Sequence, residues 1–158
     1  MAENFKNFNV VMVNAGEEMI VVPSGANGNV NHKPVYQTTN INMGENERTI
    51  DSVVQVHSLY ITQDWNGNRP NASTRYNEST FKHIDLYILD SNKSSYKIYV
   101  ASDVEIVPGC PYYIEKNITL SPTQYLVIYA PTTSEVSANS NLKINVVASA
   151  IEFKSDDQ

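Results

Sequence analysis

Short apolar runs of strand length, separated by turn residues, fill the last third of this 158-residue chain. In order, they are the segments VEIV, YYIE, ITL, QYLVIYA and LKINVVASAIEF. Pro, Gly, Asn or Ser stands between successive runs, and these residues favour tight turns. A chain with this pattern is expected to end in a sheet of short strands.

The same β-type pattern extends through the rest of the chain. No window sustains the three- and four-residue apolar spacing of an amphipathic helix. The expected strands cover residues 8–13, 18–22, 48–62, 81–90, 96–101, 103–107, 112–115, 118–120, 124–130 and 142–153. In the last of these, Ile144 and Val146 lie on one face of the strand, but Ile151 and Phe153 would lie on the opposite face. This change of face predicts a β-bulge near residues 147 and 148. Regular short strands predict an all-β fold: a single-domain antiparallel β-sandwich, jelly-roll-like, over residues 1–158.

Composition limits the classes of function. Charged residues make up 18% of the chain and apolar residues 41%, as in globular proteins, and no apolar run approaches the roughly 20 residues of a membrane helix. The net charge of −6 and the scattered Lys and Arg argue against a nucleic-acid partner. The N-terminus has no secretory signal pattern, so we expect synthesis in a cytoplasm and no membrane partner. The single cysteine, Cys110, rules out an internal disulfide and is expected to be half-buried beside a turn.

Two long polar stretches, 23–47 and 64–80, interrupt the strand rhythm and are rich in Asn. Long loops in compact domains are usually functional, so we expect two long polar loops that carry the specialised surface. The second stretch contains the only Trp. Its ring can close the loop onto the core, anchor a protein interface or stack on a host glycan. The candidate contact residues for the last two interpretations are Trp65, Asn66, Asn68, Arg69 and Tyr76.

The polar residues show no known catalytic or metal-binding motif. The histidines, His32, His57 and His83, do not stand at metal-ligand spacing, and no nucleophile-elbow or zincin motif is present. A glycine-containing segment at 25–28 precedes no helix and therefore offers no phosphate site. We expect no enzyme activity, no catalytic residues, no metal and no cofactor; a hydrolase site assembled only in space is the residual alternative.

The chain resembles a known family at both ends, in the segments MAENFKNF, MIVVPSG, VEIVPGCPYYIEKNITLSPTQYLVIYA and NVVASAIEF. These segments are similar to those of small virion structural proteins of tailed bacteriophages, particularly marine and cyanobacterial phages. The match covers roughly the first 25 and the last 55 residues. The long polar stretches depart from the family pattern, which has short turns there.

The resemblance implies a non-enzymatic β-sandwich subunit present in many copies, as a capsid decoration or as a neck or tail component. Its partners would be other copies of itself and further virion proteins, its location the virion, and its site of assembly the host cytoplasm. Phe5 and Phe8 lie in a candidate N-terminal arm, residues 1–8, that could dock on an adjacent chain. Residues 154–158 are expected to form a short C-terminal tail.

Overall fold

The computed structural model describes residues 2–14, 16, 18–25, 48–49, 51–65, 83–90, 93–107, 109–131 and 139–154. Every element in these ranges is a strand, which confirms the all-β prediction. The strands are β1 (Ala2–Asn14), β2 (Glu18–Val22), β3 (Val53–Trp65), β4 (His83–Asp90), β5 (Lys93–Glu105), β6 (Tyr112–Ile114), β7 (Ile118–Leu120), β8 (Gln124–Tyr129) and β9 (Asn139–Lys154).

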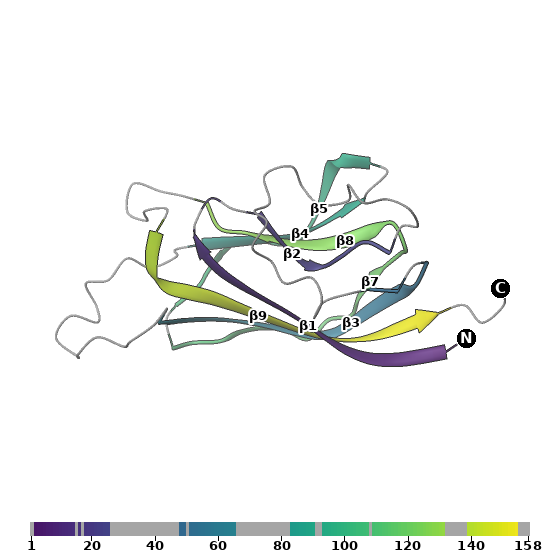
Figure 1. Ribbon diagram of the computed structural model, residues 1–158. Coiled ribbons are helices and arrows are strands. Elements are labelled where there is room, and N and C mark those ends of the chain that lie inside the picture. The colour runs from purple at the N-terminus through teal and green to yellow at the C-terminus, as the bar shows by residue number, and fades with distance from the viewer. Residues whose placement is uncertain are drawn as a thin grey trace.

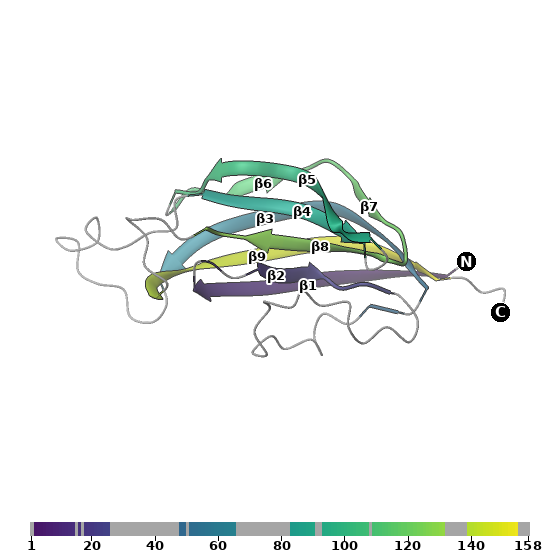
Figure 2. The same ribbon diagram turned by 90° about the horizontal axis from the view of Figure 1, so that it is seen from above.

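The strands form two antiparallel sheets that stack face to face, so the predicted β-sandwich is confirmed (Figure 1). Sheet A has the order β1-β9-β3-β6, and β7 also pairs with β3. Sheet B has the order β2-β8-β4-β5. Seen from above, β1 and β2 run along one side of the sandwich, and β5 and β6 run along the opposite side (Figure 2).

The strand pairs are nested along the chain. The first strand pairs with the last, β2 pairs with β8, β3 pairs with β6 and β7, and β4 pairs with β5. Each pair encloses in sequence the pair inside it, from β4 and β5 at the centre to β1 and β9 at the ends. The first described residue, Ala2, therefore pairs with Lys154 near the other end.

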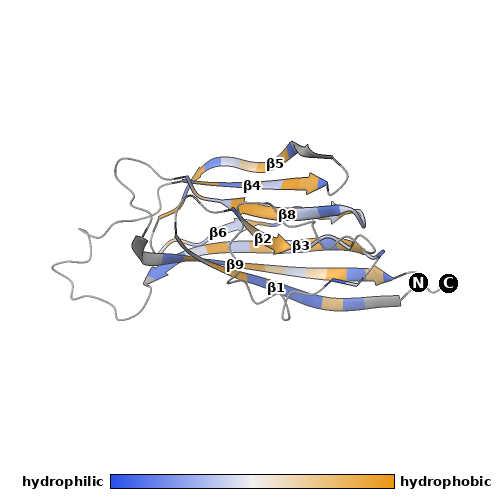
Figure 3. Ribbon diagram, turned by 45° about the horizontal axis from the view of Figure 1, so that its top comes forward, coloured by the Kyte–Doolittle hydropathy of each residue, from blue (hydrophilic) through white to orange (hydrophobic). Residues whose placement is uncertain are grey.

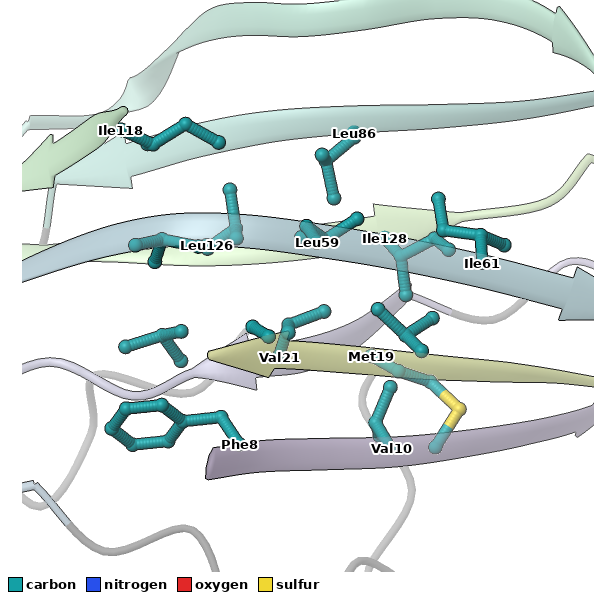
Figure 4. Close-up of a cluster of buried hydrophobic side chains, with 14 of the residues drawn as sticks. Phe8, Val10, Met19, Val21, Leu59, Ile61, Leu86, Ile118, Leu126 and Ile128 are labelled. Carbon is teal, nitrogen blue, oxygen red and sulfur yellow. The ribbon is translucent and has the colours of Figure 1, made fainter. Parts of the chain in front are cut away.

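Aliphatic side chains fill the space between the two sheets. They come from alternate positions of the strands, as the two-residue period of a pleated strand requires. Figure 4 shows the centre of this layer, where Leu59 and Ile61 of sheet A face Leu86 and Ile128 of sheet B. All four side chains are fully or almost fully buried.

Sheet B is buried on its outer face as well. A second cluster lies at the alternate positions of β2, β4 and β8 and consists of Ile20, Tyr87, Leu89, Tyr125 and Val127. Their exposed fractions are all 3% or less. Burial on both faces explains the nearly continuous apolar sequences of β2 and β8, EMIVV and QYLVIY.

The structure corrects the predicted bulge in the last strand. Ala148, Ala150 and Glu152 continue the buried phase of Ile144 without interruption, and β9 keeps a regular register with β1 from Ile144 to Lys154. The irregularity lies instead in β3, between residues 56 and 58. The prediction failed because two small alanines and a glutamate, and not large apolar residues, occupy the inner positions.

Other boundaries also differ from the predictions. β1 begins at Ala2, and β3 begins at Val53, so residues 48–49 precede the strand. The two strands expected at 96–101 and 103–107 form one irregular strand, β5, in which Asp103 has a φ of 54°. Asp103 donates its backbone N–H to Asp85 at 2.7 Å, which holds this unusual conformation. Cys110 is exposed beside the turn, whereas half-burial was expected.

Candidate interaction surface

β5 is a sheet edge that exposes large apolar side chains. It is the last strand in the order of sheet B and pairs only with β4 among the described strands. Tyr96 is 72% exposed, Ile98 55% and Tyr99 51%. Figure 3 shows the hydrophobic stretch of β5 at the rim of the sandwich. An uncovered edge with this composition is a typical template for contact with another chain.

Further exposed apolar side chains lie on the same side of the molecule. Val107 follows β5 and forms an isolated bridge with Cys110, and Tyr113 lies on β6. Tyr113 stacks on Tyr60 of β3, with ring centroids 5.8 Å apart and an angle of 27° between the rings. We call this set the apolar side; it comprises Tyr60, Tyr96, Ile98, Tyr99, Val107 and Tyr113. It follows the β5 and β6 side of the sandwich and extends onto both outer faces, to Tyr60 on sheet A and to Tyr99 on sheet B.

The side chains of Lys97 and Tyr99 are anchored on the outer face of sheet B. The Tyr99 ring meets the ring of buried Tyr87 edge-on, with centroids 5.6 Å apart. The Lys97 ammonium lies 4.7 Å from the centroid of the same Tyr87 ring and 3.6 Å from Glu18. The contact with the ring and the ion pair with Glu18 hold the Lys97 ammonium on its own sheet.

A buried polar cluster closes one end of the sandwich and holds the scaffold together. We call it the Arg48 cluster, and it consists of Lys6, Arg48, Thr49, Ser52 and Glu152. The Arg48 guanidinium donates to the Ser52 hydroxyl at 3.3 Å. It also donates, at 2.6–3.1 Å, to five backbone carbonyls, those of Pro23, Ser52, Leu120, Ser121 and Gln124. Burial lowers the pKa of Arg48 to about 10, while the charge of Glu152 opposes this shift. Arg48 therefore remains charged at neutral pH.

Glu152 is the anionic member of the cluster and is fully buried. It accepts hydrogen bonds from the Thr49 backbone N–H at 2.8 Å and from the Thr49 hydroxyl at 2.6 Å. The Lys6 ammonium lies 3.3 Å from one oxygen of the Glu152 carboxylate and donates to the other at 3.4 Å. Burial alone would raise the pKa of Glu152, but the bonds from Thr49 and the charge of Lys6 outweigh it, so the pKa is lowered. These groups satisfy one another in the interior, which gives the cluster a structural role.

Gly25 fits tightly beside this cluster. A side-chain carbon at this position would lie 2.9 Å from the Thr49 carbonyl oxygen and 3.1 Å from Arg48 Nε. The Gly25 N–H donates to the Pro122 carbonyl at 2.7 Å, and its own carbonyl accepts from Asp51 at 2.7 Å. The close approach of three backbone segments explains why glycine stands here.

The structure separates the two phenylalanines expected in an N-terminal arm. Both belong to β1, which pairs with β9 of the same chain. Phe8 is fully buried in the core, whereas Phe5 is 84% exposed. Phe5 therefore remains available for a contact with another chain, and Phe8 does not. Lys154 is the last residue of β9, and the rest of the expected tail lies outside the described residues.

The Trp65 segment falls largely outside the described residues. Trp65 itself is the last residue of β3 and pairs with Leu142, so it stands at a strand end and not within a loop. Asn66, Asn68, Arg69 and Tyr76 are outside the described ranges, as is most of the first polar stretch. The interface and glycan interpretations of this segment stay predictions.

The described histidines do not gather with other metal ligands. His57 lies at the β3 irregularity, and His83 stands 3.8 Å from the carboxylate of Asp103 on an exposed edge. Within the described ranges, no group of three His, Cys, Asp or Glu side chains could hold a metal ion. His32 is outside these ranges. The described part of the chain also holds no helix long and apolar enough to cross a membrane.

Sequence reasoning missed both the apolar side and the Arg48 cluster. The signal for the first was present, because Tyr96, Ile98 and Tyr99 place large side chains on both faces of one strand that follows a short connection. Such a strand is buried when central and exposed when it is an edge, and the pattern alone does not distinguish the two cases. Arg48 was assigned to a strand because β-branched residues follow it.

The chain matches no known protein-family model and no curated protein. Among solved structures it is similar to the VP2 subviral particle of infectious bursal disease virus, with a TM-score of 0.45, 9% identity and 98% of this chain covered. A structure of the Gx strain of the same virus gives a TM-score of 0.43 and 8% identity. The chain spans about one third of the length of these viral chains, 34% and 33%. Similarities of this size assign neither a family nor a function.

Proposed function

We propose that this chain is a non-enzymatic structural component of a virion that acts by self-association and by attachment to a larger particle. The observation that carries the proposal is the nested strand order, β1-β9-β3-β6 opposite β2-β8-β4-β5. This is the order expected when a long hairpin rolls up into a jelly roll. Jelly rolls form viral capsid domains, and they also occur in lectins and cupins.

The packed interior favours a function at the surface over a function inside the fold. Cupin-type jelly rolls hold their ligands between the sheets. Here the described inner positions carry mainly Val, Leu and Ile side chains that are buried against one another. Binding to a partner is therefore expected at the outer surface. The apolar side is the part of that surface best suited to a protein contact, because aromatic side chains are enriched in interfaces.

The particle type rests on the sequence resemblance to tailed-phage virion proteins. Within such a particle, a capsid decoration or a neck or tail accessory position fits the chain. The net charge of −6 favours an outer position, because packaged DNA repels an acidic subunit. Attachment through the apolar side would leave the rest of this acidic chain facing solvent.

Mass spectrometry of purified, nuclease-treated particles from the virus that encodes the chain tests this proposal. We expect the chain to copurify in many copies per particle and antibodies against it to label intact particles. A matched sample from a virus with the coding region deleted controls for adsorbed host protein. Particles that lack the chain throughout purification would overturn the proposal.

A further inference from the structure

We propose that β5 pairs with the β5 strand of a second copy of this chain, in antiparallel orientation about a two-fold axis. The two four-stranded B sheets would then merge into one continuous sheet. An exposed edge strand carries unpaired backbone N–H and C=O groups, and addition of a strand satisfies them. The pairing concerns the isolated chain and does not depend on its place in a virion.

The stretch from Tyr96 to Val100 lacks two of the usual protections of an edge, a proline and a free lysine. Natural edge strands avoid uncontrolled pairing through proline, β-bulges or charged side chains, especially lysine. This stretch contains no proline, and its one lysine, Lys97, is engaged with Tyr87 and Glu18 on its own sheet. The pairing of β5 with β4 is irregular between Lys93 and Ile98 and again between Tyr99 and Ala101, and Asp103 has a positive φ. These irregularities leave Tyr96, Ile98 and Tyr99 exposed, so this apolar edge is expected to be covered by a partner.

The other long edge, β1, does not show the same character. Among its described side chains, the exposed apolar residues Phe5 and Val11 stand six positions apart, and the exposed residues Asn7 and Asn9 separate them. β2 and β6 are edges as well but have only five and three residues. β5 therefore combines length and exposed apolar area in a way that the other described edges do not.

The sequence of β5 selects a second copy as the partner. The charged residues at its two ends have opposite signs, Lys93 at the start and Glu105 at the finish. Antiparallel pairing of two identical strands over their full length places Lys93 of each copy opposite Glu105 of the other. Parallel pairing in register would set like charges side by side, which is destabilising.

The apolar residues around Tyr99 are also self-complementary. Overlap of the two strands over their full length places Tyr99 at the two-fold axis and sets Ile98 of each copy beside Val100 of the other. An isologous contact of this kind closes on itself and yields a dimer.

Multi-angle light scattering of the full chain over a concentration series tests the pairing. A contact of this size is weak, so we expect a monomer–dimer equilibrium with a Kd of roughly micromolar order. Ile98→Asp is expected to remove the dimer, whereas Val11→Asp, the same change on the opposite edge, leaves it intact. Circular dichroism checks that both variants fold. A wild-type chain that stays monomeric at about 500 µM, or a dimer unaffected by Ile98→Asp, would overturn the proposal.

Cysteine cross-linking tests the geometry independently of affinity. Directly opposed positions in an antiparallel pair have Cα atoms about 4.5–5.5 Å apart, which a disulfide can bridge. In a Cys110→Ser background, Tyr99→Cys is expected to form an intermolecular disulfide readily, and Val11→Cys is not. Equal cross-linking at both positions would contradict the two-fold pairing. If the chain is found in particles but does not dimerise through β5, only this inference is overturned. If it dimerises through β5 but is absent from particles, only the virion proposal is overturned.

Discussion

Arg48 and Glu152 fix one end of the sandwich through bonds to segments that are far apart in the chain. Arg48 reaches the chain after β2, before β3 and between β7 and β8, while Glu152 ties β9 to Thr49 and Lys6. Buried charges are costly to leave unpaired, so every member of this set depends on the others. We therefore expect substitutions here to lower stability without changing the surface.

Replacement of Arg48 by lysine is expected to lower the free energy of unfolding by about 2–4 kcal/mol. A single ammonium cannot reproduce the forked donation to several carbonyls, which would leave buried acceptors unsatisfied. Urea denaturation measures the change. Lys116→Ala, at an exposed position, is the control and should shift stability by less than about 0.5 kcal/mol. Equal effects of the two substitutions would contradict the role assigned to Arg48.

Ionised Glu152 stabilises the folded chain, and acidification removes this stabilisation. Its pKa in the folded chain lies below the ordinary value of 4.5, so the folded state favours the ionised form. The resulting stabilisation is complete above pH 4.5 and is lost as the pH falls through the folded-state pKa. Urea titrations between pH 7 and pH 3 should show that Glu152→Gln is less stable than the wild type at neutral pH and approaches it on acidification. A difference that does not vary with pH would contradict this assignment.

At the scale of single strands, alternation decides which side chains hold the sandwich and which face outward. In β1, Phe8 points into the core and Phe5 points to solvent, although both stand among polar residues. Phe8→Ala is expected to lower the free energy of unfolding by about 3–5 kcal/mol, because it leaves a cavity. Phe5→Ala should change it by less than about 0.5 kcal/mol. Thermal unfolding of both variants makes the comparison, and similar losses would show that β1 is not seated as described.

The strands themselves were largely predictable from sequence, because alternating apolar and polar residues identify a strand without knowledge of its neighbours. β2 and β7 have the predicted bounds, and β8 ends one residue early. The phase of β9 was not predictable, since Ala148, Ala150 and Glu152 give a weak inner-face pattern. The edge position of β5 depends on the order of strands in the sheet, which arises from long-range pairing and leaves no local trace in the sequence.

At the scale of the whole molecule, the sandwich is a packed scaffold whose apolar side is left uncovered. The Arg48 cluster and the two apolar clusters stabilise the scaffold, and they leave Tyr96, Ile98, Tyr99 and Tyr113 at the surface. Exposed aromatic residues on a well-packed subunit are typical of a protein that completes its structure by assembly. This division between interior and surface is what the virion proposal explains.

A cryo-electron microscopy reconstruction of the intact particle tests this account most directly. We predict that density for the two-sheet sandwich repeats at symmetry-related positions on the outer surface, with the apolar side buried against neighbouring subunits. A particle in which no such density is found, or in which the apolar side of every copy faces solvent, would contradict the account.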